Sequence, residues 1–134
     1  MPGYSGTPLP KKLGIKDGIN VRVFDMPADV RAELKQSLAR CEILADGNKP
    51  ADFMMLFTKS KNELSAKFGP IAKQLAAAGM LWISWPKKSS GVATDLTEDV
   101  VREIGLAAGL VDVKVCAVTD VWSGLKFVRR LKDR

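Results

Sequence analysis

The residues best suited to chemistry lie in one stretch of the sequence, between an apolar run and a helix start. Trp85 ends the apolar run and Pro86 stops it. Ammonium groups, hydroxyls and the free amides of a glycine-containing loop beside a helix start are the components of anion-binding sites. The candidate ligand-binding residues of this loop are Lys87, Lys88, Ser89, Ser90, Gly91 and Thr94, together with Trp85 at the strand end.

This loop does not have the GxxxxGK[ST] spacing of a Walker nucleotide site. The alternative interpretation is a well-capped connection with solvated lysines. In that case Asp95-x-x-Glu98 forms a capping box for the helix that follows, and its acids complement the helix dipole.

A second candidate position is Asp25, which follows the first predicted strand and should reach the same edge of a parallel sheet as the loop. A carboxylate there can hold a ribose or a cation, or serve only in a turn or helix cap. Tyr4 and Thr7, in the N-terminal arm, could fold over this edge as a lid, or belong to a frayed terminus.

The chain contains no histidine. This excludes the Ser-His-Asp and Cys-His arrangements and the commonest general base and zinc ligand. We therefore assign no catalytic residue and no metal site from the sequence, and leave open whether the protein is an enzyme. Cys41 and Cys116 are expected to be free thiols, as in a reducing compartment.

Composition predicts one domain over residues 1–134, with an N-terminal arm at 1–16 and an α/β core at 17–134, since 46% of the 134 residues are hydrophobic. No signal peptide or membrane span is evident, so we expect a cytoplasmic protein. The net charge of +6 favours anionic ligands. The basic residues are dispersed along the sequence without interleaved aromatics, so nucleic acid is not the expected partner.

Apolar spacing and turn residues predict alternating strands and helices. Residues 42–45 are either an antiparallel or edge segment or not a strand, because the link to the next strand is too short for a crossover helix. The expected fold class is α/β, a three-layer α-β-α Rossmann-like open sheet of about five to six strands, mostly parallel, with a C-terminal antiparallel strand. The predicted strands are 21–24, 52–57, 81–85, 111–118 and 121–128, and the predicted helices are 27–40, 61–78 with an interruption at Gly69-Pro70, and 97–108.

Two blocks carry a resemblance to a known family: GYSGTPLPKKLGIKDG at Gly3–Gly18, and the segment Trp82–Val128, which begins WISWPKKSSG. Across nearly the whole chain they resemble the small bacterial family of domains of unknown function DUF3052, a likeness that implies no activity. The layout is also similar to that of class I S-adenosylmethionine-dependent methyltransferases, again with a final antiparallel strand. Unlike those enzymes, this chain has no glycine-rich turn at Phe24–Asp29, and it lacks a helix and a strand between Ala45 and Ala51.

Together these features favour a non-catalytic binding module, similar to a truncated methyltransferase, for a small anionic ligand or a protein partner. One alternative is a methyltransferase-like enzyme with an atypical pocket, for which S-adenosylmethionine is a possible cofactor although its motif is absent. The third hypothesis is a nucleic-acid-binding module that uses the basic termini.

Overall fold

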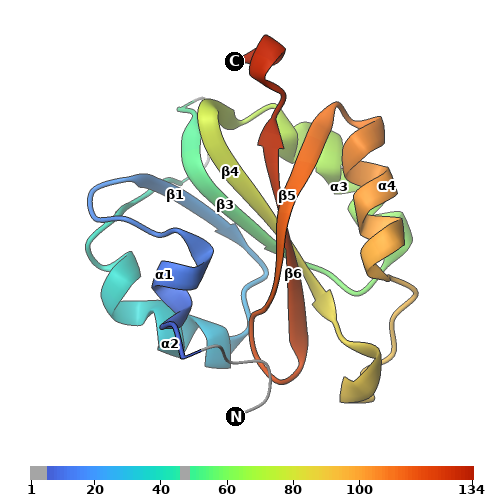
Figure 1. Ribbon diagram of the computed structural model, residues 1–134. Coiled ribbons are helices and arrows are strands. Elements are labelled where there is room, and N and C mark those ends of the chain that lie inside the picture. Colours follow the sequence, from blue (N-terminus) through green and yellow to red (C-terminus); the bar gives the residue numbers. More distant parts are fainter. Residues whose placement is uncertain (1–5, 46–48) are drawn as a thin grey trace.

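The computed structural model describes residues 6–45 and 49–134 and shows one sheet between two layers of helices (Figure 1). Two short 3₁₀ turns, η1 (Lys88–Ser90) and η2 (Leu131–Asp133), complete the regular structure of these residues. The helices are α1 (Leu9–Leu13), α2 (Ala28–Leu38), α3 (Lys61–Ala72) and α4 (Glu98–Ala107). The strands are β1 (Asn20–Phe24), β2 (Glu42–Ile43), β3 (Ala51–Phe57), β4 (Leu75–Pro86), β5 (Leu110–Ala117) and β6 (Trp122–Arg129).

The six strands lie in the order β2-β1-β3-β4-β6-β5. The first four are mutually parallel, and β6 runs antiparallel to both of its neighbours. From β1 the chain first moves outward to β2, then returns to the other side of β1 to form β3. The direction of winding therefore switches between β1 and β3, which is where open α/β sheets bind their ligands. The predicted mixed sheet is confirmed.

The central strands are buried on both faces because helices cover both sides. On one face, α1 and α2 pack through apolar residues such as Leu13 and Leu34 against Phe53 of β3. On the other face, α3 and α4 pack against Met54 and Phe127. Adjacent residues 53 and 54 point to opposite layers, as the pleat of a strand requires.

The 42–45 region forms a short edge strand, β2, but the antiparallel alternative is wrong. Glu42 and Ile43 pair in parallel with Asn20 and Val21 of β1. No crossover helix is needed because β2 is only two residues long and is separated from β3 by β1, so the chain has little distance to return. Among the described residues between β2 and β3, none is in a helix or strand.

Helix α3 is shorter than the 61–78 helix that the sequence predicts. It ends at Ala72, with Pro70 inside its last turn, and β4 already begins at Leu75. The apolar spacing was misleading because Leu75 is buried in the same core cluster as Phe68 and Ile71 of the helix. Between the pairs Ala51–Leu75 and Phe53–Met80, β4 contains a pronounced irregularity.

The start of α4 also differs from the expectation. Its N-cap is Thr97, whose side chain accepts a hydrogen bond from the Val100 amide, so the predicted capping box of Asp95 and Glu98 is wrong. The carboxylate of Asp95 instead accepts a hydrogen bond from the amide of Lys61, at 2.8 Å. It therefore caps α3, a helix far earlier in the sequence.

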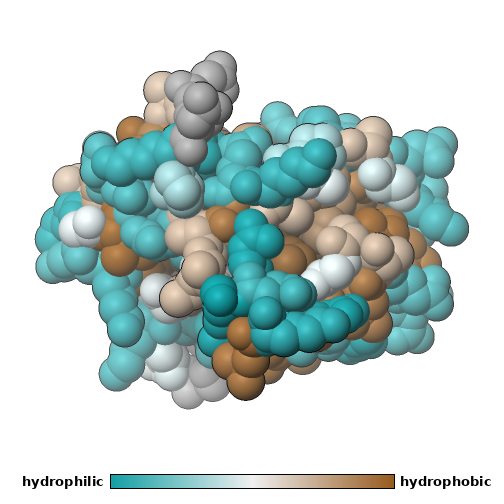
Figure 2. Space-filling model, turned by 90° about the horizontal axis from the view of Figure 1, so that it is seen from above, coloured by the Kyte–Doolittle hydropathy of each residue, from teal (hydrophilic) through white to brown (hydrophobic). Residues whose placement is uncertain are grey.

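Figure 2 looks onto the end of the molecule where the C-terminus lies, which is opposite the carboxyl ends of the parallel strands. Hydrophilic residues cover much of this end and interrupt its apolar areas. Among the described residues, no helix combines the length and the apolar character needed to cross a membrane.

Candidate functional site

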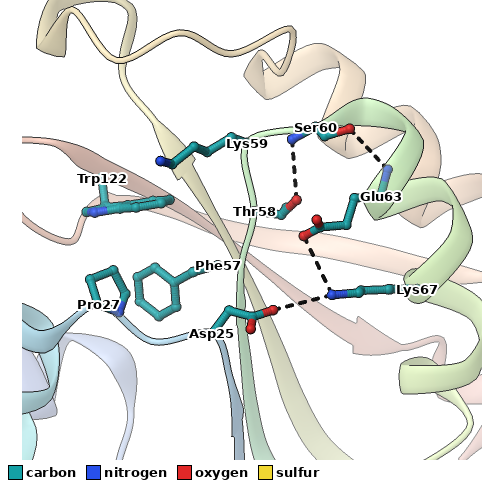
Figure 3. Close-up of a pocket in the computed structure, with 9 residues that line it drawn as sticks. All are labelled: Asp25, Pro27, Phe57, Thr58, Lys59, Ser60, Glu63, Lys67 and Trp122. Carbon is teal, nitrogen blue, oxygen red and sulfur yellow. Dashed lines mark hydrogen bonds and ion pairs between the residues drawn. The ribbon is translucent and has the colours of Figure 1, made fainter.

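An open cleft lies at the carboxyl ends of β1 and β3, beside the start of α3 (Figure 3). Its volume of about 510 Å³ lies within the range of small-molecule sites. The position coincides with the switch in winding direction between β1 and β3. The cleft is lined by Asp25, Pro27, Phe57, Thr58, Lys59, Ser60, Glu63, Lys67 and Trp122.

Asp25 forms the turn that follows β1, and its backbone has a φ of 57°. Aspartate is one of the residues that tolerate this left-handed conformation. Its carboxylate Oδ2 lies 3.3 Å from Nζ of Lys67, and the same Nζ lies 3.7 Å from Oε1 of Glu63. The hydrogen bond from Lys67 to Asp25 raises the pKa of Lys67 above its ordinary value, and the charges of both carboxylates add to this effect.

This ion triad can be rearranged at low cost. The side chains of Asp25, Lys67 and Glu63 are 61%, 45% and 42% exposed. Exposed ion pairs contribute little net free energy, because water competes for both charges. A ligand that offers its own charged groups can therefore replace the contacts within the triad.

The opposite part of the cleft is apolar. Phe57, the last residue of β3, meets Trp122 edge to face, with ring centroids 5.1 Å apart. Figure 3 shows both rings beside Pro27, away from the ion triad. The cleft thus combines a charged side with an aromatic side, and both rings are largely buried.

Lys59 and Ser60 occupy the loop between β3 and α3. Ser60 caps α3 by accepting a hydrogen bond from the amide of Glu63. Lys59 is exposed, and within the described residues its ammonium group forms no ion pair. Lys59 therefore supplies the cleft with a positive charge that has no countercharge in this part of the chain.

The loop predicted from the sequence supports this segment from behind. The hydroxyl of Thr94 donates a hydrogen bond to the carbonyl of Lys59, at 2.6 Å, and Asp95 accepts one from the Lys61 amide. Thr94 and Asp95 thus hold the backbone on both sides of Ser60. Neither of them lines the cleft itself.

Of the residues predicted from the sequence to bind a ligand, only Asp25 lines the cleft. Lys88, Ser89 and Ser90 form η1, and Gly91 ends it with a φ of 78°. The hydroxyl of Ser90 donates to the carbonyl of Lys87, whose own amide donates to Val121. This hydroxyl and this amide are therefore engaged in local structure.

The remaining candidates lie elsewhere. Trp85 is 5% exposed and packs in the core between the sheet and the layer of α3 and α4. Thr7 lines a second pocket, formed by α1 and β5. Tyr4, the other predicted lid residue, lies outside the described residues.

Sequence reasoning missed the α3 side of the cleft. Glu63 and Lys67 are four residues apart and so lie on one face of α3. The signal that could have found them is the order of the strands: once β1 and β3 are neighbours at a switch point, the turn after β1 faces the helix after β3. That order depends on which side of β1 each later strand joins, and local sequence patterns do not specify this.

The charged side of the cleft suits part of S-adenosylmethionine, since Asp25 and Glu63 can receive its ammonium group. The adenosine part has no comparable support, because β2 is two residues long and the described residues after it, Leu44 and Ala45, are apolar. The described residues therefore do not form a complete site for this cofactor, and we derive no methyl-transfer step. No group of three or more Cys, Asp or Glu side chains in the described part of the chain is arranged to hold a metal ion.

Several solved structures with a similar fold are methyltransferases. An S-adenosylmethionine-dependent methyltransferase from Aquifex aeolicus superposes with a TM-score of 0.60 and 21% identity over 87% of this chain and 85% of that one. Magnesium protoporphyrin IX methyltransferase from Synechocystis PCC 6803, with bound S-adenosylhomocysteine, superposes with a TM-score of 0.58. The identity is 14%, over 91% of this chain and 78% of that one. A TehB-like methyltransferase from Corynebacterium glutamicum superposes with a TM-score of 0.56 and 10% identity over 91% of this chain and 85% of that one. At these identities the likeness shows the fold alone.

Among curated protein sequences, none matches this chain significantly. The sequence model of one family, described as proteins of unknown function, matches residues 10–131. The predicted resemblance is confirmed: the chain belongs to the DUF3052 family and has a class I methyltransferase-like fold.

Proposed function

We propose that the protein is a non-catalytic binding domain whose cleft at the ends of β1 and β3 takes a small molecule that carries both an anionic and a cationic group. The observation that supports this is the composition of the lining. It contains two ammonium groups, from Lys59 and Lys67, and two carboxylates, from Asp25 and Glu63. A purely anionic ligand matches this balanced lining less well than a zwitterion does.

The positive charge of Lys59 lies apart from the two carboxylates of the cleft. Both carboxylates contact Lys67 on the α3 side, whereas Lys59 extends from the β3–α3 loop (Figure 3). The anionic group of the ligand would bind Lys59, and its cationic group would bind Asp25 and Glu63. An apolar portion would pack against Trp122 and Phe57, which are already held in contact.

A second candidate function, an S-adenosylmethionine-dependent enzyme with an atypical pocket, is favoured by the place of the cleft in the fold. Similar folds include the protein crystallised with S-adenosylmethionine from Synechocystis PCC 6803. This cofactor carries an ammonium group, a carboxylate and a sulfonium, so it belongs to the proposed ligand class. The absence of histidine from the chain makes the binding function the first choice.

The test is a thermal-unfolding series with S-adenosylmethionine, S-adenosylhomocysteine, methionine and uncharged adenosine. A ligand at a hundredfold its Kd stabilises the native state by about 2.7 kcal/mol. We expect at least one of the three zwitterions to raise Tm and adenosine to have little effect. If none of the three raises the Tm of the wild-type protein at millimolar concentration, the proposal is wrong.

Two variants and a control locate the binding. Lys59→Ala and Asp25→Asn should weaken it, whereas Lys88→Ala, which removes an exposed lysine from η1, should not. Transfer of a methyl group from S-adenosylmethionine to any acceptor would favour the enzyme over the binding domain.

A further inference from the structure

Four lysines from three separate segments of the sequence gather on one side of the sheet. Lys11 and Lys12 belong to α1, Lys114 lies on β5, and Lys126 lies on β6. Ammonium Nζ of Lys114 donates a hydrogen bond to the carbonyl of Lys12, at 2.9 Å, and Nζ of Lys12 donates one to the carbonyl of Ala117, also at 2.9 Å. The charge that looks dispersed in the sequence is therefore concentrated in the folded chain.

These lysines are held close to one another. Lys114 and Lys126 are direct cross-strand partners in the antiparallel pair of β5 and β6, an arrangement in which like charges destabilise a sheet. Burial, and then the charge of Lys114, lower the pKa of Lys126 below its ordinary value. Within residues 6–45 and 49–134, none of Lys11, Lys114 and Lys126 takes part in an ion pair.

A pocket of about 430 Å³ opens beside this cluster. Thr7, Lys11, Lys12 and Lys114 line it, together with Val115, Cys116 and Ala117. Lys12 is only 8% exposed, so its ammonium group is fixed in place by the protein instead of moving freely in solvent. The lining therefore offers ammonium groups and a hydroxyl to an anion, and contains no carboxylate.

We infer that this lysine pocket, between α1 and β5, binds the phosphate group of a small phosphate-bearing molecule. A phosphate dianion accepts several hydrogen bonds and neutralises more than one ammonium group, which fits a concave site with several lysines. The pocket's volume of about 430 Å³ lies within the range of small-molecule sites, so we expect a small ligand. The site is separate from the cleft at β1 and β3, because the two linings share no residue.

The test uses pyrophosphate as the probe, titrated by calorimetry into the full chain at low salt. The wild-type protein should bind it, and Lys11→Gln and Lys114→Gln should each weaken binding by about tenfold or more, since each removes an ammonium group from the pocket lining. Lys35→Gln, which makes the same charge change on the exposed face of α2, is the matched control and should change affinity by less than about twofold.

A second readout separates this role from a structural one. Without ligand, Lys126→Gln should raise Tm by about 1–3 °C, because it relieves the repulsion from Lys114. Lys126 does not line the pocket, so this change should weaken pyrophosphate binding far less than Lys114→Gln does, although both remove one positive charge.

Three results would overturn the inference. The first is a wild-type protein that does not bind pyrophosphate. The second is binding that Lys59→Ala abolishes while both pocket variants retain it, since the phosphate would then occupy the cleft. The third is a single-stranded oligonucleotide that binds far more tightly than pyrophosphate and loses affinity in the same two variants, because the surface would then serve nucleic acid.

Discussion

Asp25 occupies the position at which methyltransferases place a glycine-rich turn, and it changes what that turn can do. Glycine there lets a ligand approach the backbone, whereas Asp25 adopts a left-handed conformation and points a carboxylate at Lys67. Figure 3 shows this side chain directed across the cleft toward α3. The turn after β1 therefore presents a side-chain carboxylate, and not a bare backbone, to a ligand in the cleft.

The coupling between Asp25 and Lys67 can be measured by titration. Because Asp25 is the largest cause of the raised pKa of Lys67, Asp25→Asn should lower that pKa toward its ordinary value. A raised folded-state pKa means that the pair contributes stability below the unfolded-state pKa and loses it as pH rises through the folded-state pKa. The loss therefore falls in the alkaline range, not near neutrality.

NMR detection of the Lys67 side chain during an alkaline titration gives the measurement. Lys73→Asn serves as the control, because it replaces another exposed lysine, the one at the C-cap of α3. It should leave the Lys67 titration unchanged. A Lys67 pKa that is identical in the wild type and in Asp25→Asn would show that the two groups do not interact in solution.

At the scale of elements, the loop between β4 and α4 is a support for the cleft. Its Asp95 caps α3, and its Thr94 holds the carbonyl of Lys59. The start of α3 therefore depends on a segment more than thirty residues later in the chain. These contacts give Thr94 and Asp95 a structural role, although neither residue lines the cleft.

Asp95→Ala should lower the free energy of unfolding by about 1 kcal/mol, the usual effect of removing a helix cap. Urea unfolding provides the measurement. Asp95→Asn keeps an oxygen that can accept a hydrogen bond from the Lys61 amide, so it should lower the free energy of unfolding by clearly less than Asp95→Ala does. Equal losses in the two variants would mean that the charge of Asp95, and not the hydrogen bond, supports the helix.

Local patterns predicted most of the elements because α2, β3 and β6 each present clear apolar spacing or an apolar run. The prediction failed where two elements share one core. Leu75 continues the helical spacing of Phe68 and Ile71, yet it belongs to β4, because both elements face the same cluster. The cap of α3 was missed for a related reason, since a contact between Asp95 and Lys61 leaves no local signal.

At the scale of the whole molecule, the fold is a methyltransferase-like sheet with a reduced edge. The chain reaches the two-residue β2 and returns to β3 without a further helix or strand in the described residues. The carboxyl ends of β1 and β3 keep an open cleft, whereas the described residues of the sheet beyond β1 offer little to hold an adenosine. This asymmetry is why we place a small zwitterion in the cleft. Of the residues that line the cleft, the sequence predicted only Asp25, because the others depend on the order of the strands.

The most direct test of this account is backbone-amide NMR mapping during titration with whichever zwitterion raises Tm most. We expect the largest shifts at Asp25, in the Thr58–Ser60 segment and at Trp122. Largest shifts confined to the loop at Lys87–Gly91, with none at Asp25 or Lys59, would contradict it.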